Sequence, residues 1–212
     1  MAIYETEEEQ VEALKRWWRE NGRSTLTGVI VGIAIIVGWN LWQDYKQNQA
    51  LQASALYAQL LKAHDEDNRE SVEKIAERIT EQFGGTAYSD YAKLFQAKVK
   101  VQQGNLDEAK QILEAVVKNG DEDIANAGKL GVIRILLAKG EYEQGLQMIA
   151  EASYGDGFSG AYNELQGDLY VALERFGEAR TAYQAALRSG HKSPLLQFKL
   201  DDITEAEIIA NP

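Results

Sequence analysis

The chain has 212 residues, and its 33 acidic against 22 basic residues give a formal net charge of −11. A chain this negative, without a concentrated basic patch, is a poor partner for a phosphate backbone, so nucleic-acid binding is not expected. The lack of cysteine excludes disulfides, thiol nucleophiles and cysteine zinc sites, and two distant histidines, His64 and His191, argue against a histidine metal site or triad. We therefore predict no catalytic, cofactor-binding or metal-ligating residues, and we do not expect an enzyme.

Residues 1–23 form a polar tail. Apolar side chains recur in it at helical spacing with basic ones among them: Val11, Leu14, Trp17 and Trp18, then Lys15, Arg16 and Arg19. This pattern fits an amphipathic helix on a membrane surface, or an unstructured tail whose tryptophans rest at headgroup depth. The residues alone leave both interpretations open.

The next segment, residues 24–43, carries no charge, and its centre at 29–37 is apolar on every side of a helix. At about 1.5 Å per residue it gives about 30 Å of helix, one hydrocarbon thickness. No small-x-small cleavage site follows it, and Trp39 and Trp42 suit a membrane–water interface. Because the mean hydropathy of the whole chain is only −0.37, we predict one uncleaved transmembrane helix on a water-soluble domain.

Basic residues flank this segment unequally. Those before it are Lys15, Arg16, Arg19 and Arg23, and the nearest after it are Lys46 and Lys62. Since basic flanks stay in the cytoplasm, we predict a single-pass membrane protein with a cytoplasmic N-terminus. The domain over residues 44–212 then lies outside the cytoplasm, which in a bacterium is the periplasm.

Small residues recur four apart within the span, as Gly28 with Gly32 and as Ala34 with Gly38. Such pairs let a second membrane helix approach closely. Glycine is also common in membrane helices in general, so the pairs indicate either a helix-packing surface or small residues that contact no partner.

Three related hexamers follow, starting at Gly104, Gly140 and Glu174, with offsets of 36 and 34 residues. Each lies between two helical patterns and supplies a turn, an aromatic or leucine residue, and a small residue where two helices cross. The positions of the third repeat resemble the tetratricopeptide pattern most clearly: Gly167, Tyr170, Ala179, Tyr183 and Ala186.

We therefore predict an all-α protein, a single N-terminal transmembrane helix followed by a tetratricopeptide-like helical solenoid. A helix pair cannot bury its apolar face alone, so neighbouring pairs stack. The predicted parts are an irregular first pair at about 48–83, repeats at about 91–121, 127–157 and 161–192, and a capping helix at 194–209.

Tetratricopeptide-like arrays usually hold partners on the concave side, which their first helices line. The predicted groove positions mix apolar and charged residues: Tyr91, Leu94, Lys98, Val101, Leu130, Arg134, Leu137, Asp168 and Val171. They lack the ring of lysine, arginine and asparagine that clamps a free carboxylate, so we expect extended or hydrophobic segments. The leucines among them fit packing between helices equally well.

The segment Gly155–Gly160 spells G-x-G-x-x-G, the fingerprint of a dinucleotide site. That fingerprint requires a preceding strand and a βαβ unit. Because a helical pattern precedes it, we interpret it as a loop between repeats.

The chain also resembles the YfgM family, the ancillary subunit of the bacterial SecYEG translocon. The residues that carry the resemblance are Ile3–Glu5, Gln10–Arg16, Glu20–Gly22, the span from Gly28 to Trp39, and the repeats.

The resemblance implies an inner-membrane protein near the translocon and the membrane-anchored periplasmic chaperone PpiD. It implies a non-catalytic adaptor that helps to pass translocated polypeptides to periplasmic chaperones. The alternative is a membrane-anchored regulator of an envelope-stress response that acts through its cytoplasmic tail.

Overall fold

The computed structural model describes residues 7–210, and the side chains of residues 9–203. This part of the chain is helical and contains no strand, which confirms the predicted all-α class. Of the residues that carry the family resemblance, Ile3–Glu5 lie outside the described range. The helices are α1 (Glu7–Asp65), α2 (Arg69–Gln82), α3 (Ala87–Gln102), α4 (Leu106–Asn119), α5 (Glu122–Lys139), α6 (Tyr142–Glu151), α7 (Asp156–Ala172), α8 (Phe176–Arg188) and α9 (Leu196–Ala210).

The chain divides into two compact units, one ending at Leu51 and one from Gln52 to Pro212. The first unit is the N-terminal part of α1. It holds one stretch that is long and apolar enough to cross a membrane, and none of that stretch is buried. Apolar side chains around its full circumference are exposed, as with Ile30 at 57% and Ile35 at 66%. This exposure fits a helix that meets lipid rather than a protein core.

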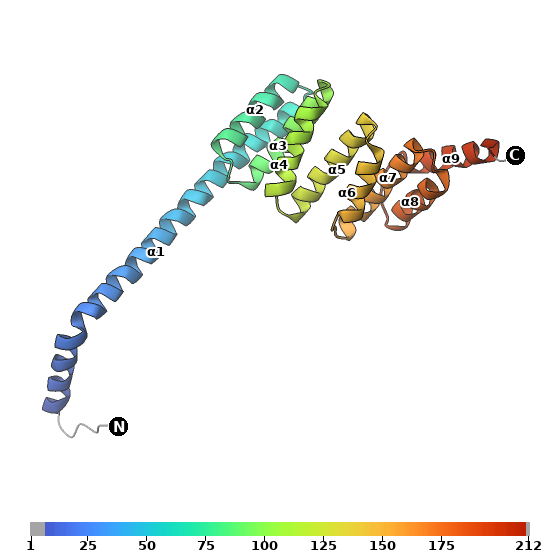
Figure 1. Ribbon diagram of the computed structural model, residues 1–212. Helices are drawn as coiled ribbons and strands as arrows, with labels where there is room; N and C mark the ends of the chain where they lie inside the picture. The colour runs from blue at the N-terminus through green and yellow to red at the C-terminus, as the bar shows by residue number, and fades with distance from the viewer. Residues whose placement is uncertain (1–6, 211–212) are drawn as a thin grey trace. The chain divides into compact units, whose positions relative to one another are not determined.

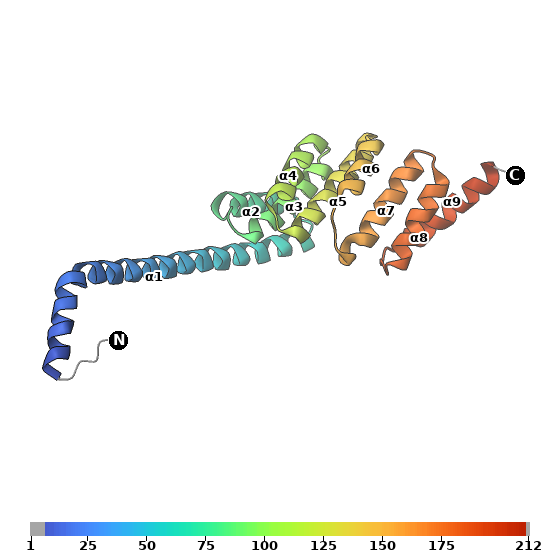
Figure 2. The same ribbon diagram turned by 60° about the horizontal axis from the view of Figure 1, so that its bottom comes forward.

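Helix α1 bends in its N-terminal part (Figure 2). Two side chains near the end of the tail bond to the helix backbone: Asn21 Nδ2 donates to the Trp17 carbonyl, and Thr25 Oγ1 donates to the Asn21 carbonyl. Gly22 lies between these two residues, and a Cβ added at Gly22 would be 3.3 Å from atoms of the Trp18 ring. Side-chain hydrogen bonds to the backbone and glycine are common at helix bends.

Helix α1 continues beyond the predicted membrane segment as far as Asp65. The stretch from Trp39 to Asp65 contains neither glycine nor proline, so nothing in the sequence ends the helix. The last part of α1 then serves as the first helix of the solenoid. Ala53, Leu56 and Leu60 pack with α2 and α3 in a core that also contains Ile79 and Phe83.

The second unit is a stack of antiparallel helix pairs that follow one another in chain order (Figure 1). Each of the first four pairs turns at one residue with a positive φ: Asp67 (51°), Gly104 (81°), Gly140 (79°) and Glu174 (59°). The left-handed conformation at this position is what the repeated hexamers encode, and glycine adopts it most easily. Asp67 and Glu174 adopt it at some cost in free energy.

We call a junction the place where one helix pair meets the first helix of the next. The first junction joins α1 and α2 to α3, the second joins α3 and α4 to α5, the third joins α5 and α6 to α7, and the fourth joins α7 and α8 to α9. The third contains a buried polar contact, in which the Tyr162 hydroxyl donates to Asn126 Oδ1 at 2.9 Å. Both residues are almost fully buried.

The helix pairs begin a few residues before the expected repeats, at Ala87, Glu122 and Asp156. Because α7 begins at Asp156, the segment Gly155–Gly160 forms the N-cap and first turn of α7 rather than the predicted loop between repeats. The capping helix α9 packs on α8 through Leu196 and Ile203.

Candidate partner-binding groove

The second junction contains a groove of about 600 Å³. It runs between α3 and α5, with α4 behind them. Its polar lining residues are Lys98, Gln102 and Arg134. The others are apolar or small: Leu94, Ala97, Val101, Leu106, Leu113, Ala127, Gly131, Ile135 and Ala138. The groove is therefore an apolar surface with two cations at its edge, and its volume is within the range of ordinary ligand pockets.

Gly131 explains why the second junction stays open. A Cβ at Gly131 would stand 2.8 Å from Leu113 Cδ1, so α5 lies directly against α4. The repeat-equivalent positions in α3 and α7 are Phe95 and Leu165, which fill the corresponding space in their own junctions. Missing a side chain at this position, α5 leaves room between itself and α3.

Only part of the predicted groove lies in this one. Leu94, Lys98, Val101 and Arg134 line it. Tyr91 instead places its ring 5.7 Å from that of Tyr57, centroid to centroid.

The other predicted positions lie in the later junctions. Leu130 is 5% exposed and packs in the core of the third junction, with Leu137 beside it. Asp168 and Val171 belong to the fourth junction.

The groove residues that sequence reasoning missed are Ala97 and Gln102 on α3, Leu106 and Leu113 on α4, and Ala127, Gly131, Ile135 and Ala138 on α5. The spacing of 127, 131, 134 and 138 is itself a helical face. The run of small residues on that face was the available signal.

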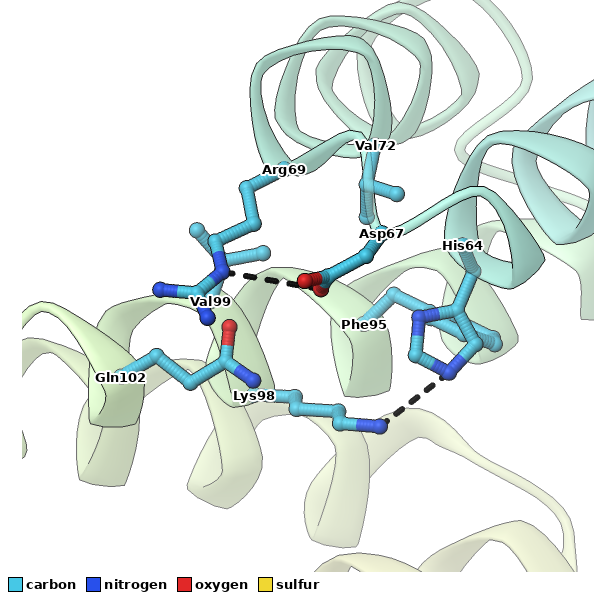
Figure 3. A pocket seen from close by; sticks show the side chains of 8 residues that line it. All are labelled: His64, Asp67, Arg69, Val72, Phe95, Lys98, Val99 and Gln102. Carbon is cyan, nitrogen blue, oxygen red and sulfur yellow. Dashed lines mark hydrogen bonds and ion pairs between the residues drawn. The ribbon is translucent and has the colours of Figure 1, made fainter.

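The first junction has the same arrangement but is nearly closed (Figure 3). Its cavity of about 20 Å³ has room for little more than a water molecule. Lys98 Nζ lies 3.1 Å from His64 Nε2, and Arg69 Nε lies 3.8 Å from Asp67 Oδ1. Phe95 and these polar side chains fill the space that the second junction leaves open.

The fourth junction is closed by ion pairs. Lys199 Nζ on α9 donates to Glu164 Oε1 and to Asp168 Oδ2 on α7, each at 2.8 Å. Ser193 Oγ also donates to Glu164, and His191 Nε2 lies 3.0 Å from its other oxygen. We call this set of five residues the α9 latch.

The latch residues shift one another's titration. Burial raises the pKa of the Glu164 carboxyl, but hydrogen bonds from Lys199 and Ser193 and the Lys199 charge outweigh it, so the pKa lies below its usual range. Burial lowers the pKa of Lys199, and its hydrogen bonds to Asp168 and Glu164 more than offset this, so the pKa is raised. Both groups are therefore held in their charged forms.

Glu164 and Asp168 occupy the repeat positions that Leu94 and Lys98 occupy in the groove. In the fourth junction the carboxylates at these two positions bind the Lys199 ammonium, whereas in the second junction one of the two positions carries the cation Lys98. Arg134, at the position of Asp168 in α5, takes part in none of the ion pairs found among residues 9–203. Arg134 is thus left to attract an anionic group at the groove, and Lys98, whose ammonium contacts His64 and not a carboxylate, adds a second positive charge.

The described helices and the groove define a helical-repeat protein that carries an apolar N-terminal helix. Comparison with known families agrees, since the family described as "Tetratricopeptide repeat-like domain" matches residues 15–205. The chain belongs to this family.

Curated relatives align with it end to end. A protein of Escherichia coli (strain K12) is 26% identical over 210 residues, one of Haemophilus influenzae (strain ATCC 51907 / DSM 11121 / KW20 / Rd) is 27% identical over 206, and one of Neisseria gonorrhoeae (strain ATCC 700825 / FA 1090) is 24% identical over 211. Each alignment covers 96% of this chain and 100% of the relative, and each relative is named "Ancillary SecYEG translocon subunit". The resemblance found in the sequence is confirmed.

Proposed function

We propose that the protein is a membrane-anchored, non-catalytic adaptor that associates with the SecYEG translocon. The observation that carries the proposal is the coverage of relatives with that name from end to end, so that the apolar helix and the repeats are matched together. Mild-detergent purification from native membranes after cross-linking tests it. Translocon subunits should be recovered with the full chain, and their absence would contradict the proposal.

The proposed topology places residues 1–23 in the cytoplasm, residues 24–43 in the membrane and residues 44–212 in the periplasm. The basic flank before the span supports it. Because the chain has no cysteine, single cysteines at the exposed residues Glu12 and Lys118 can be labelled with an impermeant maleimide on spheroplasts. The cysteine at 118 should react and the cysteine at 12 should not. The reverse result would invert the topology.

We place a helix-packing surface on the span. In the structure the positions of Gly28, Gly32 and Gly38 face open space, with nothing within 4 Å of a built Cβ. At 3.6 residues per turn the pair Gly28–Gly32 and the pair Ala34–Gly38 lie on different sides of the helix, so they offer two contact surfaces rather than one. Replacing Gly28 and Gly32 with leucine should cost about 1–2 kcal/mol of helix association without affecting insertion.

The partner surface is the groove of the second junction. Its apolar lining suits hydrophobic or extended segments, either of translocating polypeptides or of a periplasmic chaperone of the PpiD kind. The adaptor would pass the translocating polypeptides to such a chaperone. The variant Lys98→Glu/Arg134→Glu should reduce cross-linking to partners by about tenfold, because it reverses both cations at the groove. The control Lys118→Glu/Arg188→Glu makes the same change of charge outside the groove. Equal effects in both variants would remove the groove from the proposal.

A second candidate is a regulator that acts through the tail. Leu14 and Trp18 are 65% and 56% exposed, so the tail helix offers an apolar surface to a membrane or a partner. Deleting residues 1–20 while keeping the span separates the two functions. An adaptor should keep its translocon association after the deletion, whereas a tail-dependent regulator should lose its effect on the stress response.

A further inference from the structure

The last helix of the stack, together with the turn residue before it, has apolar side chains on its outer face. Leu195 is 61% exposed and Phe198 is 70% exposed, whereas Leu196 and Ile203 on the opposite face are buried against α8. The end of a repeat array normally carries a polar outer surface, since no further repeat covers it. Two large side chains left in water at this end indicate a surface that another element covers.

Acidic side chains continue the same face. Asp201 and Asp202 are exposed and follow Phe198 by three and four residues, which is about one helical turn. We call Leu195, Phe198, Asp201 and Asp202 the α9 patch. It presents two apolar side chains and then two negative charges along one side of α9 and the turn that precedes it.

The groove has the complementary features. Its lining is apolar, and Lys98 and Arg134 add positive charge at its edge. The fourth junction shows how this chain fills the equivalent positions: Lys199 meets Glu164 and Asp168 while Leu196 and Leu200 of the same helix pack beside them. With the charges reversed, the second junction calls for an apolar helix that carries carboxylates.

The α9 patch cannot reach the groove of its own chain while α9 stays on α8. Releasing α9 would expose Leu196 and Ile203 and would break the α9 latch. We therefore propose that the α9 patch of one copy docks into the groove of a second copy. This proposal uses the groove of the proposed function but does not depend on the translocon. Self-association and partner binding then compete for one surface.

Disulfide cross-linking tests this contact in the full chain, reconstituted in lipid vesicles. One version carries Ala138→Cys in the groove, and a second version carries Leu195→Cys in the patch. When the two versions are mixed, a disulfide between different chains should form about tenfold faster than in a control mixture of Lys118→Cys with Leu195→Cys. Position 118 is also exposed but lies outside the groove.

Exchanging the charges between the groove and the α9 patch separates loss of the contact from loss of folding, because a variant that fails to fold cannot be rescued by a change in the other chain. Adding Lys98→Glu/Arg134→Glu to the groove version should lower the cross-linking rate about tenfold, and adding Asp201→Arg/Asp202→Arg to the patch version should restore it. Equal rates at positions 138 and 118, or no rescue by the exchanged charges, would overturn the proposal. A cysteine at 138 that forms adducts only with other proteins would also overturn it. Normal recovery of translocon subunits alongside any of these results would leave the proposed function standing.

Discussion

The second and third junctions are built from matching positions of the repeat, and they differ in what those positions do. In the third, Leu165 and Leu169 of α7 pack with Leu130 and Ile133 of α5 in one buried core. In the second, the residue that matches Leu165 is Gly131, and a groove of about 600 Å³ remains. The helices α5 and α7 accordingly contact each other more extensively than α3 and α5 do. We attribute the groove of the second junction to the missing side chain at Gly131.

Backbone proximity acts in opposite directions at the two junctions. In the third, a Cβ at Gly145 would stand 2.9 Å from Leu169 Cδ2, so the bare backbone of α6 accommodates a large side chain of α7. In the second, the bare backbone of α5 accommodates Leu113 of α4. Gly145 allows α7 of the next repeat to lie close to α6, whereas Gly131 allows α5 to lie close to α4 of the preceding repeat.

The largest expected effect comes from opening the closed junction. Leu165→Ala should lower the free energy of unfolding by about 2–5 kcal/mol, because it removes a buried side chain from a packed core. The same type of change in the groove, Leu94→Ala, should cost less than about 1.5 kcal/mol, since Leu94 is only partly buried. Denaturant unfolding followed by circular dichroism measures both. Equal losses would mean that the two junctions do not differ in packing.

The buried polar contact of the third junction gives the next effect. Tyr162→Phe should cost about 1–3 kcal/mol, because it leaves Asn126 Oδ1 buried without its donor. Burial also raises the pKa of Tyr162 to about 12, so the hydroxyl stays protonated at neutral pH. The control is Tyr154→Phe on the neighbouring stacked ring, which should change stability by no more than about 0.5 kcal/mol. A loss in the control as large as in Tyr162→Phe would assign the cost to ring packing instead.

The α9 latch predicts a dependence on acid. The pKa of Glu164 is lower when folded, so its contribution is complete above the usual glutamate value of about 4.3 and is lost as pH falls through the lower folded value. Glu164→Gln should lower stability by about 1 kcal/mol near neutral pH and flatten the acid limb of the stability curve. The exposed pair Glu70–Lys74 offers Glu70→Gln as the control, which should leave most of that limb intact. An unchanged acid limb in Glu164→Gln would contradict the latch.

The smallest effect on stability is expected from filling the open junction. Ala138→Leu places an apolar side chain at the exposed edge of the groove and should change the free energy of unfolding by no more than about 0.5 kcal/mol. It should still reduce partner cross-linking, because the occupant loses that space. Ala138→Ser keeps the volume small and should bind as the natural chain does. Full binding by a stable Ala138→Leu variant would place the contact elsewhere on the groove.

The sequence was sufficient to predict the class of fold. The hexamers at Gly104, Gly140 and Glu174 predicted the turns, and the uncharged run at 24–43 predicted the apolar helix. The left-handed backbone at the first position of each hexamer was visible only in the structure. The extent of α1 was not predicted, although the absence of glycine and proline after Trp39 allows a continuous helix to Asp65.

The face of α5 that lines the groove was also not predicted. Transferring positions from one repeat to the next selects Leu130 and Leu137 beside Arg134, but a helical period shows which residues share a face and not which neighbour covers it. The contact of Gly131 with Leu113 turns the face with Ala127 and Ala138 toward α3 instead. Such a contact depends on the distance between two helices, which no local pattern contains.

The hydrogen bond between Tyr162 and Asn126 also has a consequence for how the array assembles. Apolar ridges of similar repeats can slide past one another by a turn with little loss, so hydrophobic packing alone specifies their alignment weakly. A slipped alignment of α5 and α7 would bury both polar groups without partners, at a cost of several kcal/mol. The hydrogen bond between Asn126 and Tyr162 therefore fixes the register of α5 and α7. It makes the correct stacking lower in free energy than the slipped alignments that a repetitive sequence otherwise allows.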